Sequence, residues 1–375
     1  MAGIYIHIPF CKQKCSYCDF HFSTNLHNKS NLVKAINKEL LLRKNEISQP
    51  LETIYFGGGT PSILSEIELE SIFETIFKNY STQNLKEVTL EANPDDLNQK
   101  KLKFLKSTPI NRFSIGVQSF FEEDLQLMNR AHNAQEAEQS IKLVQDFGFD
   151  NITIDLIYGS STTTNDMWMK NLQQAINLNV PHISSYALTV EEKTILDHQI
   201  KKGITKPVDE DRQNEQFQLL VDTLTSNNFI QYEISNFGKE NYFSLHNSNY
   251  WKGIHYMGIG PSAHSYNGKS RAWNIANNIK YIQAINQNNL PQEIEVLNEA
   301  ERFNEMIMIG LRTIYGIDVD RINSEFSQPI LDLFYQEINQ LIKENLIIQQ
   351  ENKIILKPES KFFADGIASR LFYID

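Results

Sequence analysis

The sequence predicts an α/β fold: a partial (β/α)6 TIM-like barrel, a mixed covering region and a small, mainly helical C-terminal domain. Up to about residue 190, short β-rich runs alternate with helical patterns, which is typical of βα units and a parallel sheet. Six such units are too few for a complete eight-stranded barrel, so a partial, open barrel is the simplest closure. From about residue 205 the sequence becomes mixed and aromatic-rich, and after about residue 296 helical patterns dominate.

The expected strands are short runs rich in β-branched and aromatic residues. They are Gly3–Ile8, Thr53–Phe56, Glu87–Ala92, Arg112–Val117, Asn151–Tyr158 and His182–Leu188. Apolar residues at three- and four-residue spacing predict the helices. The helices expected between the strands are Asn31–Arg43, Glu66–Asn79, Ala134–Phe147 and Asn165–Leu178. Near the end of the chain we expect helices over Ala300–Thr313 and Pro329–Glu344 and a short apolar run over Lys353–Leu356.

These changes of pattern divide the chain into three parts. Residues 1–205 form the expected barrel, residues 206–295 a mixed α/β extension that covers its open side, and residues 296–375 the small end domain. In such a barrel the active site lies at the carboxyl ends of the strands. Side chains that follow the strands are therefore the first candidates for function.

Composition excludes two classes of protein. The 35 Lys and Arg against 46 Asp and Glu give a formal net charge of −11, with no basic stripe to neutralise phosphates, which argues against direct nucleic-acid binding. No run approaches the roughly 18 apolar residues of a membrane helix, and the first residues lack the features of an export signal. We therefore expect a cytoplasmic protein that is not integral to a membrane.

All three cysteines lie within eight residues, as Cys11, Cys15 and Cys18. An odd, clustered set without an export signal points to metal or redox chemistry rather than to disulfides. A C-x3-C-x2-C loop directly after the first strand can wrap three thiolates around a [4Fe–4S] cluster. Because such clusters are normally held by four thiolates, one iron is left open for an exogenous ligand.

Two other interpretations of the cysteines remain. One is a Cys3His zinc site completed by His7 or His21, in a zinc-stabilised binding module, and the other is three unrelated thiols. The spacing favours the iron–sulfur cluster, because zinc knuckles more often use C-x2-C pairs. The three cysteines are thus the expected metal ligands.

The cysteine loop, with Tyr17 before its third cysteine, resembles the signature of the radical S-adenosylmethionine (SAM) superfamily. The resemblance implies that SAM chelates the open iron through its amino and carboxylate groups. The segment Gly57-Gly58-Gly59-Thr60-Pro61, after the second strand, is similar to the element that receives the methionyl amine. On its own, this glycine-rich segment would be a turn.

Polar residues at the ends of successive strands match further superfamily elements. Glu91, Gln118, Arg130 and Asp155 each have an ordinary alternative as solvated or paired side chains, but a zwitterion and a ribose need carboxylates, an arginine and amides at one place. Asp155 lies in an otherwise apolar strand, where an unpaired carboxylate is costly. The SAM contacts that the resemblance implies are Tyr5, Gly58, Gly59, Thr60, Glu91, Gln118, Arg130 and Asp155.

Within the superfamily, the chain looks like a member of the oxygen-independent coproporphyrinogen III oxidase group. The similar motifs are Tyr5–Cys11, Arg112–Phe120 and Gly258–Ala263. The decarboxylating oxidases carry a further cysteine two residues beyond the third, where this chain has Asp19-Phe20, and an amino-terminal extension that this chain lacks. Both departures resemble the second subgroup, the HemW-type haem chaperones.

That subgroup also carries an H-N-x-x-Y-W motif, matched here by His246 to Trp251. A neutral imidazole is a common haem-iron ligand, and Tyr250 and Trp251 can stack on a flat macrocycle. The alternative is a satisfied histidine and two aromatic residues in a core between domains. His255 and His264 are further ligand candidates.

The resemblance implies a cytoplasmic haem chaperone that binds a [4Fe–4S] cluster, SAM and haem and delivers haem to acceptor proteins, among them membrane-bound respiratory proteins. It also suggests a homodimer. The alternative function is that of an oxygen-independent coproporphyrinogen III oxidase, which uses radical SAM chemistry to decarboxylate propionates. The sequence assigns no catalytic residue for either function.

Overall fold

The computed structural model describes residues 2–374. Its larger part is built on one 12-stranded sheet, in which six parallel strands follow one another in chain order. These strands are β1 (Ala2–Ile8), β2 (Leu51–Gly58), β3 (Glu87–Ala92), β4 (Arg112–Gln118), β5 (Ile152–Tyr158) and β6 (His182–Ala187). The predicted partial barrel of six βα units is confirmed.

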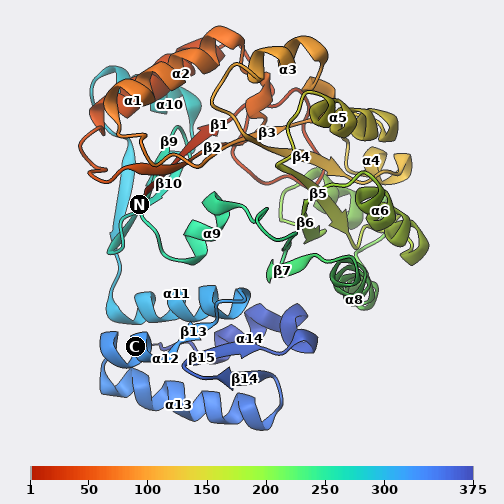
Figure 1. Ribbon diagram of the computed structural model, residues 1–375, viewed down its shortest axis with the longest axis vertical. Helices are drawn as coiled ribbons and strands as arrows, with labels where there is room; N and C mark the ends of the chain where they lie inside the picture. Colours follow the sequence, from red (N-terminus) through yellow and green to blue (C-terminus); the bar gives the residue numbers. More distant parts are fainter. Residues whose placement is uncertain (1, 375) are drawn as a thin grey trace.

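Helices cover the outer side of the curved sheet (Figure 1). They are α1 (Lys29–Leu42), α2 (Glu66–Asn79), α3 (Gln99–Leu105), α4 (Glu122–Leu127), α5 (Ala134–Asp146), α6 (Asn165–Asn177) and α8 (Glu210–Ser226), with 3-10 turns η1 (Pro61–Ile63) and η2 (Pro94–Asp96). Helix α7 (Ile195–Lys201) instead contacts the loop after β1, where Leu196 N donates to Ser16 O (2.8 Å). Local sequence fixes where several of the helices begin. Ser65 with Glu68 and Asn133 with Glu136 form capping boxes that satisfy the first free amides of α2 and α5.

Residues 206–295 extend the barrel sheet at both edges. On one side β9 (Tyr256–Ile259) pairs in parallel with β1, and the antiparallel strands β10 (His264–Tyr266), β11 (Ser270–Asn274) and β12 (Gln292–Val296) follow. On the other side β8 (Asn236–Gly238) and β7 (Ile230–Glu233) are added to β6. Helix α10 (Asn278–Asn286) packs on α1, and α9 (Leu245–Trp251) lies on the inner side of the curve (Figure 1).

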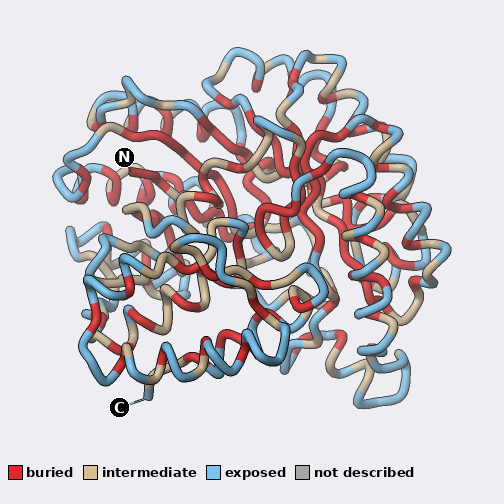
Figure 2. Tube along the Cα trace, turned by 60° about the horizontal axis from the view of Figure 1, so that its bottom comes forward, coloured by how far each residue is buried: buried red, intermediate tan, exposed pale blue. Residues whose placement is uncertain are grey.

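The C-terminal part has a hydrophobic core of its own, which includes Phe303, Ile307 and Phe334. Its elements are α11 (Glu299–Arg312), β13 (Ile317–Asp318), α12 (Val319–Glu325), α13 (Gln328–Lys343), β14 (Ile347–Gln350), β15 (Lys353–Leu356), η3 (Pro358–Phe363) and α14 (Ala364–Arg370). The predicted mainly helical character is confirmed, with a small three-stranded sheet in addition. Figure 2 shows the buried residues concentrated along the barrel strands and the inner faces of the helices.

No helix within residues 2–374 is both long enough and apolar enough to cross a membrane.

The carboxylate of Glu39, on α1, joins the barrel to its β9–β12 extension. It is fully buried and accepts hydrogen bonds from Arg43 Nη1 (3.0 Å), Gly260 N (2.8 Å), Asn274 Nδ2 (2.8 Å) and Tyr281 Oη (2.6 Å). A buried charge is tolerated only with such complete pairing. The four donors come from four separate segments, so this one side chain fixes how they meet.

Replacing Glu39 with Ala is expected to lower the free energy of unfolding by about 3 kcal/mol or more, because Gly260 N and Tyr281 Oη lose their acceptor and the buried Arg43 loses one of its two carboxylate partners. Urea unfolding followed by circular dichroism measures the change. The matched control is Glu138→Ala, since the pair of Glu138 with Lys142 is exposed and is worth less than about 1 kcal/mol. Equal losses in the two variants would contradict the role given to Glu39.

Candidate functional site

The three cysteines lie in the loop that follows β1, at the carboxyl end of the strand, and all three are partly exposed. The loop is tied to the chain after α4, because Ser16 donates through its amide to Met128 O (3.0 Å) and through its hydroxyl to Leu127 O (2.7 Å). Both hydrogen bonds come from Ser16, which lies between Cys15 and Cys18. The loop therefore holds its thiols against the segment that leads to Arg130.

The donor set suits an iron–sulfur cluster. Within residues 2–374, no three His, Cys, Asp or Glu side chains surround one point closely enough to hold a single metal ion. In a cuboidal cluster the thiolates bind separate irons, so they need not converge on one point. The histidines considered as zinc ligands are otherwise engaged: His7 Nε2 hydrogen-bonds with His21 O (3.1 Å), and His21 Nε2 with Asn278 Oδ1 (2.8 Å).

Burial controls the protonation of two of the thiols. It raises the pKa of Cys18 to about 11, and it raises the pKa of Cys11 against the opposing hydrogen bond from Thr60. Both groups are therefore protonated near neutral pH when free. Because iron binds the thiolate, loading of a cluster must release these protons.

Arg130 lies beside the cysteine loop. Its Nη1 is 3.2 Å from Cys15 Sγ, and its Nη2 donates to Asn93 Oδ1 (2.8 Å) and Gly116 O (2.7 Å). Its Nε is buried and has no partner within the part of the chain that the structure describes. A cation that touches a thiol sulfur and keeps one unused donor suits an anionic ligand at the same place.

Two carboxyl groups lie inside the barrel, Glu91 near the end of β3 and Asp155 in the middle of β5. Glu91 Oε1 accepts from Tyr55 Oη (2.8 Å) and Oε2 from Gly58 N (3.1 Å), while Asp155 Oδ1 accepts from Ser114 Oγ (3.4 Å). Although neither is wholly closed to solvent, burial raises the pKa of Glu91 to about 8 and that of Asp155 to about 7. An ammonium group placed beside either carboxyl would favour its ionised form.

The glycine segment after β2 has a packing role. Gly58 has a φ of +107°, and a Cβ on Gly57 would lie 2.8 Å from the Tyr5 ring. A Cβ on Gly59 would lie 2.7 Å from Phe10 O, next to the cysteine loop. Thr60 N also donates to Phe10 O (2.7 Å). The glycines thus bring β2 close to the start of the cysteine loop.

The structure brings most of the expected SAM contacts together. The backbone at Gly57 lies against the side chains of Tyr5, Tyr55 and Glu91, and Glu91 also accepts hydrogen bonds from Tyr55 and from Gly58 N. Asp155 is close enough to Glu91 and Arg130 to interact with their charges. Gln118 is buried at a β-bulge with a φ of +67°. We did not predict from the sequence that Tyr55 and Asn93 lie beside these residues. Side chains two residues apart in a strand lie on the same face, so the position of Gly57 could have indicated that Tyr55 faces the same way.

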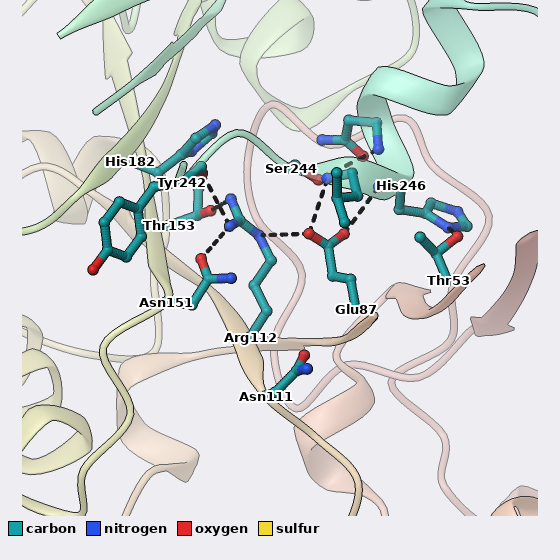
Figure 3. Close-up of polar contacts among 12 residues, drawn as sticks. Thr53, Glu87, Asn111, Arg112, Asn151, Thr153, His182, Tyr242, Ser244 and His246 are labelled. Carbon is teal, nitrogen blue, oxygen red and sulfur yellow. Dashed lines mark hydrogen bonds and ion pairs between the residues drawn. The ribbon is translucent and has the colours of Figure 1, made fainter. Parts of the chain in front are cut away.

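Helix α9, which carries the H-N-x-x-Y-W motif, is anchored on the barrel by Glu87 (Figure 3). The Glu87 carboxylate accepts from Leu245 N and His246 N, each at 2.9 Å, and its Oε2 lies 3.9 Å from Arg112 Nε. Arg112 is itself buried and donates to Asn151 Oδ1 and to Thr153 Oγ1 (2.6 Å). Sequence reasoning missed this pair, because nothing local to Glu87 or Arg112 indicates a helix more than 130 residues away.

His246 is only 2% exposed, and both of its ring nitrogens are engaged. Nδ1 hydrogen-bonds with Thr53 Oγ1 (2.7 Å) and Nε2 with Tyr250 Oη (2.7 Å), while the ring stacks on Tyr55 at 5.0 Å. Burial lowers the pKa of His246 to about 3, so the ring is neutral. In this structure His246 presents no free nitrogen to an iron, because Thr53 and Tyr250 hold both.

The other candidate haem residues are more open. Tyr250 and Trp251 line a cavity, and Trp251 Nε1 is buried without a hydrogen-bond partner within residues 2–374. His264 is exposed and stacks on Trp273 at 6.0 Å, whereas His255 is partly exposed. Neither His255 nor His264 lines that cavity.

Comparisons with known proteins agree with this fold. The radical SAM superfamily model matches residues 5–180, and the HemN C-terminal domain model matches residues 297–363. A structure of coproporphyrinogen III oxidase (HemN) from Escherichia coli superposes with a TM-score of 0.85 at 20% identity, covering 99% of this chain and 90% of that one, which shows the shared fold.

Sequence similarity identifies the family. The proteins named heme chaperone HemW from Bacillus subtilis and Lactococcus lactis are 32% and 33% identical to the chain. The first match covers 98% of both chains, and the second covers 93% of this chain and 92% of its relative. The chain therefore belongs to the HemW family of the radical SAM superfamily.

Proposed function

We propose that this chain is a haem chaperone that binds a [4Fe–4S] cluster, SAM and haem and transfers haem to acceptor proteins. The observation that carries the proposal is the similarity to HemW proteins along almost the whole chain, which includes the cysteine loop and the motif on α9. The arrangement in the structure supports it. The loop and the motif helix lie on the same barrel, with Tyr55 between Glu91 and His246.

Cys11, Cys15 and Cys18 would hold the cluster, whose open iron binds SAM and which supplies an electron when reduced. Arg130 stabilises the charge at Cys15 from 3.2 Å. Glu91, in its ionised form, would accept a hydrogen bond from the amino group of SAM. The remaining proposed contacts are Tyr5 and Asp155, within β1 and β5, and Gly58, Gly59, Thr60 and Gln118, at or after the ends of β2 and β4.

We assign haem binding to His246, Tyr250 and Trp251. Since His246 holds the Tyr250 hydroxyl at 2.7 Å, its first effect is to fix the ring of Tyr250. The proposal includes cytoplasmic action, which suits three free thiols in a reducing compartment. It also includes membrane-bound respiratory proteins among the acceptors, and a homodimer.

The first prediction concerns His246. Replacing His246 with Ala is expected to weaken haem binding about tenfold or more, because Tyr250 loses the partner that positions it; tenfold corresponds to about 1.4 kcal/mol. Haem titration of anaerobically purified protein, followed by Soret absorbance, measures the affinity. Iron and sulfide content should stay unchanged, and His198→Ala, at an exposed histidine, is the matched control. Unchanged haem affinity would remove His246 from the proposal.

The second prediction separates the chaperone from an oxidase. At the positions next to the cluster loop where the oxidases carry a further cysteine, this chain has Asp19 and Phe20, and the Phe20 ring is 69% exposed. Anaerobic incubation with coproporphyrinogen III, SAM and a reductant is therefore expected to give no protoporphyrinogen, with a known oxidase as the positive control. Sustained turnover would make the chain an oxidase.

The third prediction uses the raised pKa of Glu91. Since SAM needs the ionised carboxylate, its affinity for cluster-loaded protein should rise up to about tenfold per pH unit towards pH 8 and then level off. Glu91→Gln should weaken binding and flatten this rise, whereas Asp146→Asn, at an exposed residue, should not. Anaerobic equilibrium dialysis between pH 6 and 9 measures both. The titration of SAM itself affects all variants equally, so identical slopes in wild type and Glu91→Gln would exclude Glu91.

A further inference from the structure

A cavity of about 760 Å³ lies where the barrel meets the C-terminal part. One wall comes from the end of α9 and from β9, β10 and β11, and the other wall from α11 and the elements after it. Lining residues on α11 run from Glu301 to Gly310, so the cavity extends for about 14 Å along the helix at 1.5 Å per residue. Figure 1 shows α9 between the barrel sheet and α11.

One wall of the cavity carries aromatic side chains, and the other carries flexible methionine side chains. Tyr250, Trp251 and Tyr256 line the barrel side, and the Tyr250 and Tyr256 rings meet edge to face at 4.5 Å. Met306 and Met308 line the side formed by α11. Flat rings opposite adaptable thioethers suit a planar, apolar macrocycle, and a thioether is also a known haem-iron ligand.

Most of the charges that line the cavity neutralise one another. Arg271 forms an ion pair with Glu305 (2.9 Å). Two further ion pairs join Arg321 to Glu325 and Lys353 to Asp318. Three lining charges make no ion pair with any residue between 2 and 374: Lys252, Glu301 and Arg302. Lys252 lies over the Tyr315 ring at 4.9 Å, and Glu301 accepts from Asn298 N in the capping box of α11. Arg302 is exposed, and its only side-chain hydrogen bond within the described residues is from Nε to Asn298 O (3.4 Å).

Arg302 lies one helical turn before Glu305, on the same face of α11, and so beside the Arg271 pair. Two guanidinium groups at one end of a cavity with aromatic and methionine walls suit a ligand with carboxylates along one edge.

We propose that this cavity is the haem site, with the macrocycle between Trp251 and the α11 methionines and the propionates at Arg302 and Arg271. The proposal rests on the proposed haem function and deepens it. It assigns the C-terminal part a definite role, because α11 supplies half of the site.

The test is haem titration of full-length, cluster-loaded protein and of Arg302→Glu. Since Arg302 is exposed, the variant should fold, and it should bind haem at least about tenfold more weakly, because an attractive charge becomes repulsive. Haem dimethyl ester, which lacks the carboxylates, should bind wild type and variant alike. Lys343→Glu, an exposed charge reversal in the same part of the chain and outside the cavity, is the control.

A second variant tests the opposite wall. Met306→Ala with Met308→Ala should weaken both haem and its dimethyl ester, with thermal unfolding as the check that the C-terminal part stays folded. If wild type binds haem and both variants match it, the cavity is not the haem site and the chaperone function stands. If wild type itself binds no haem, the function proposed above fails.

Discussion

The Glu87 carboxylate holds together the two parts of the molecule that matter for function. It accepts hydrogen bonds from the first two amides of α9, where a negative charge is favoured by the helix dipole, and Arg112 compensates its charge. A helix of seven residues is not stable alone, so α9 depends on this anchor. The position of the H-N-x-x-Y-W motif is therefore set by two buried side chains on β3 and β4.

Tyr55 connects the proposed SAM site to that motif. Its hydroxyl donates to Glu91, its ring stacks on His246, and His246 in turn holds Tyr250. The proposed SAM contacts and the motif on α9 are thus parts of one continuous set of contacts between buried and partly buried side chains.

The elements with strong periodicity were predictable from sequence, and those held by distant partners were not. Helix α2 and strand β3 begin and end at the predicted residues, because capping and alternation are local signals. The edge strands of residues 230–296 are short and acquire their pairing from β1 and β6, far away in the chain. The strand-end candidates could be found because parallel strands bring their carboxyl ends together, whereas the enclosure of His246 depends on Thr53, 193 residues earlier.

The pairing of β1 with β9 has a consequence for synthesis of the chain. Gly3 is opposite Tyr256 and Ile6 is opposite Ile259, so one edge of the first strand lacks its neighbour until about 250 further residues have been made. At 5 to 20 residues per second this takes roughly 12 to 50 seconds. Throughout that interval the nascent protein has an open strand edge beside its cysteine loop, and such edges invite aggregation.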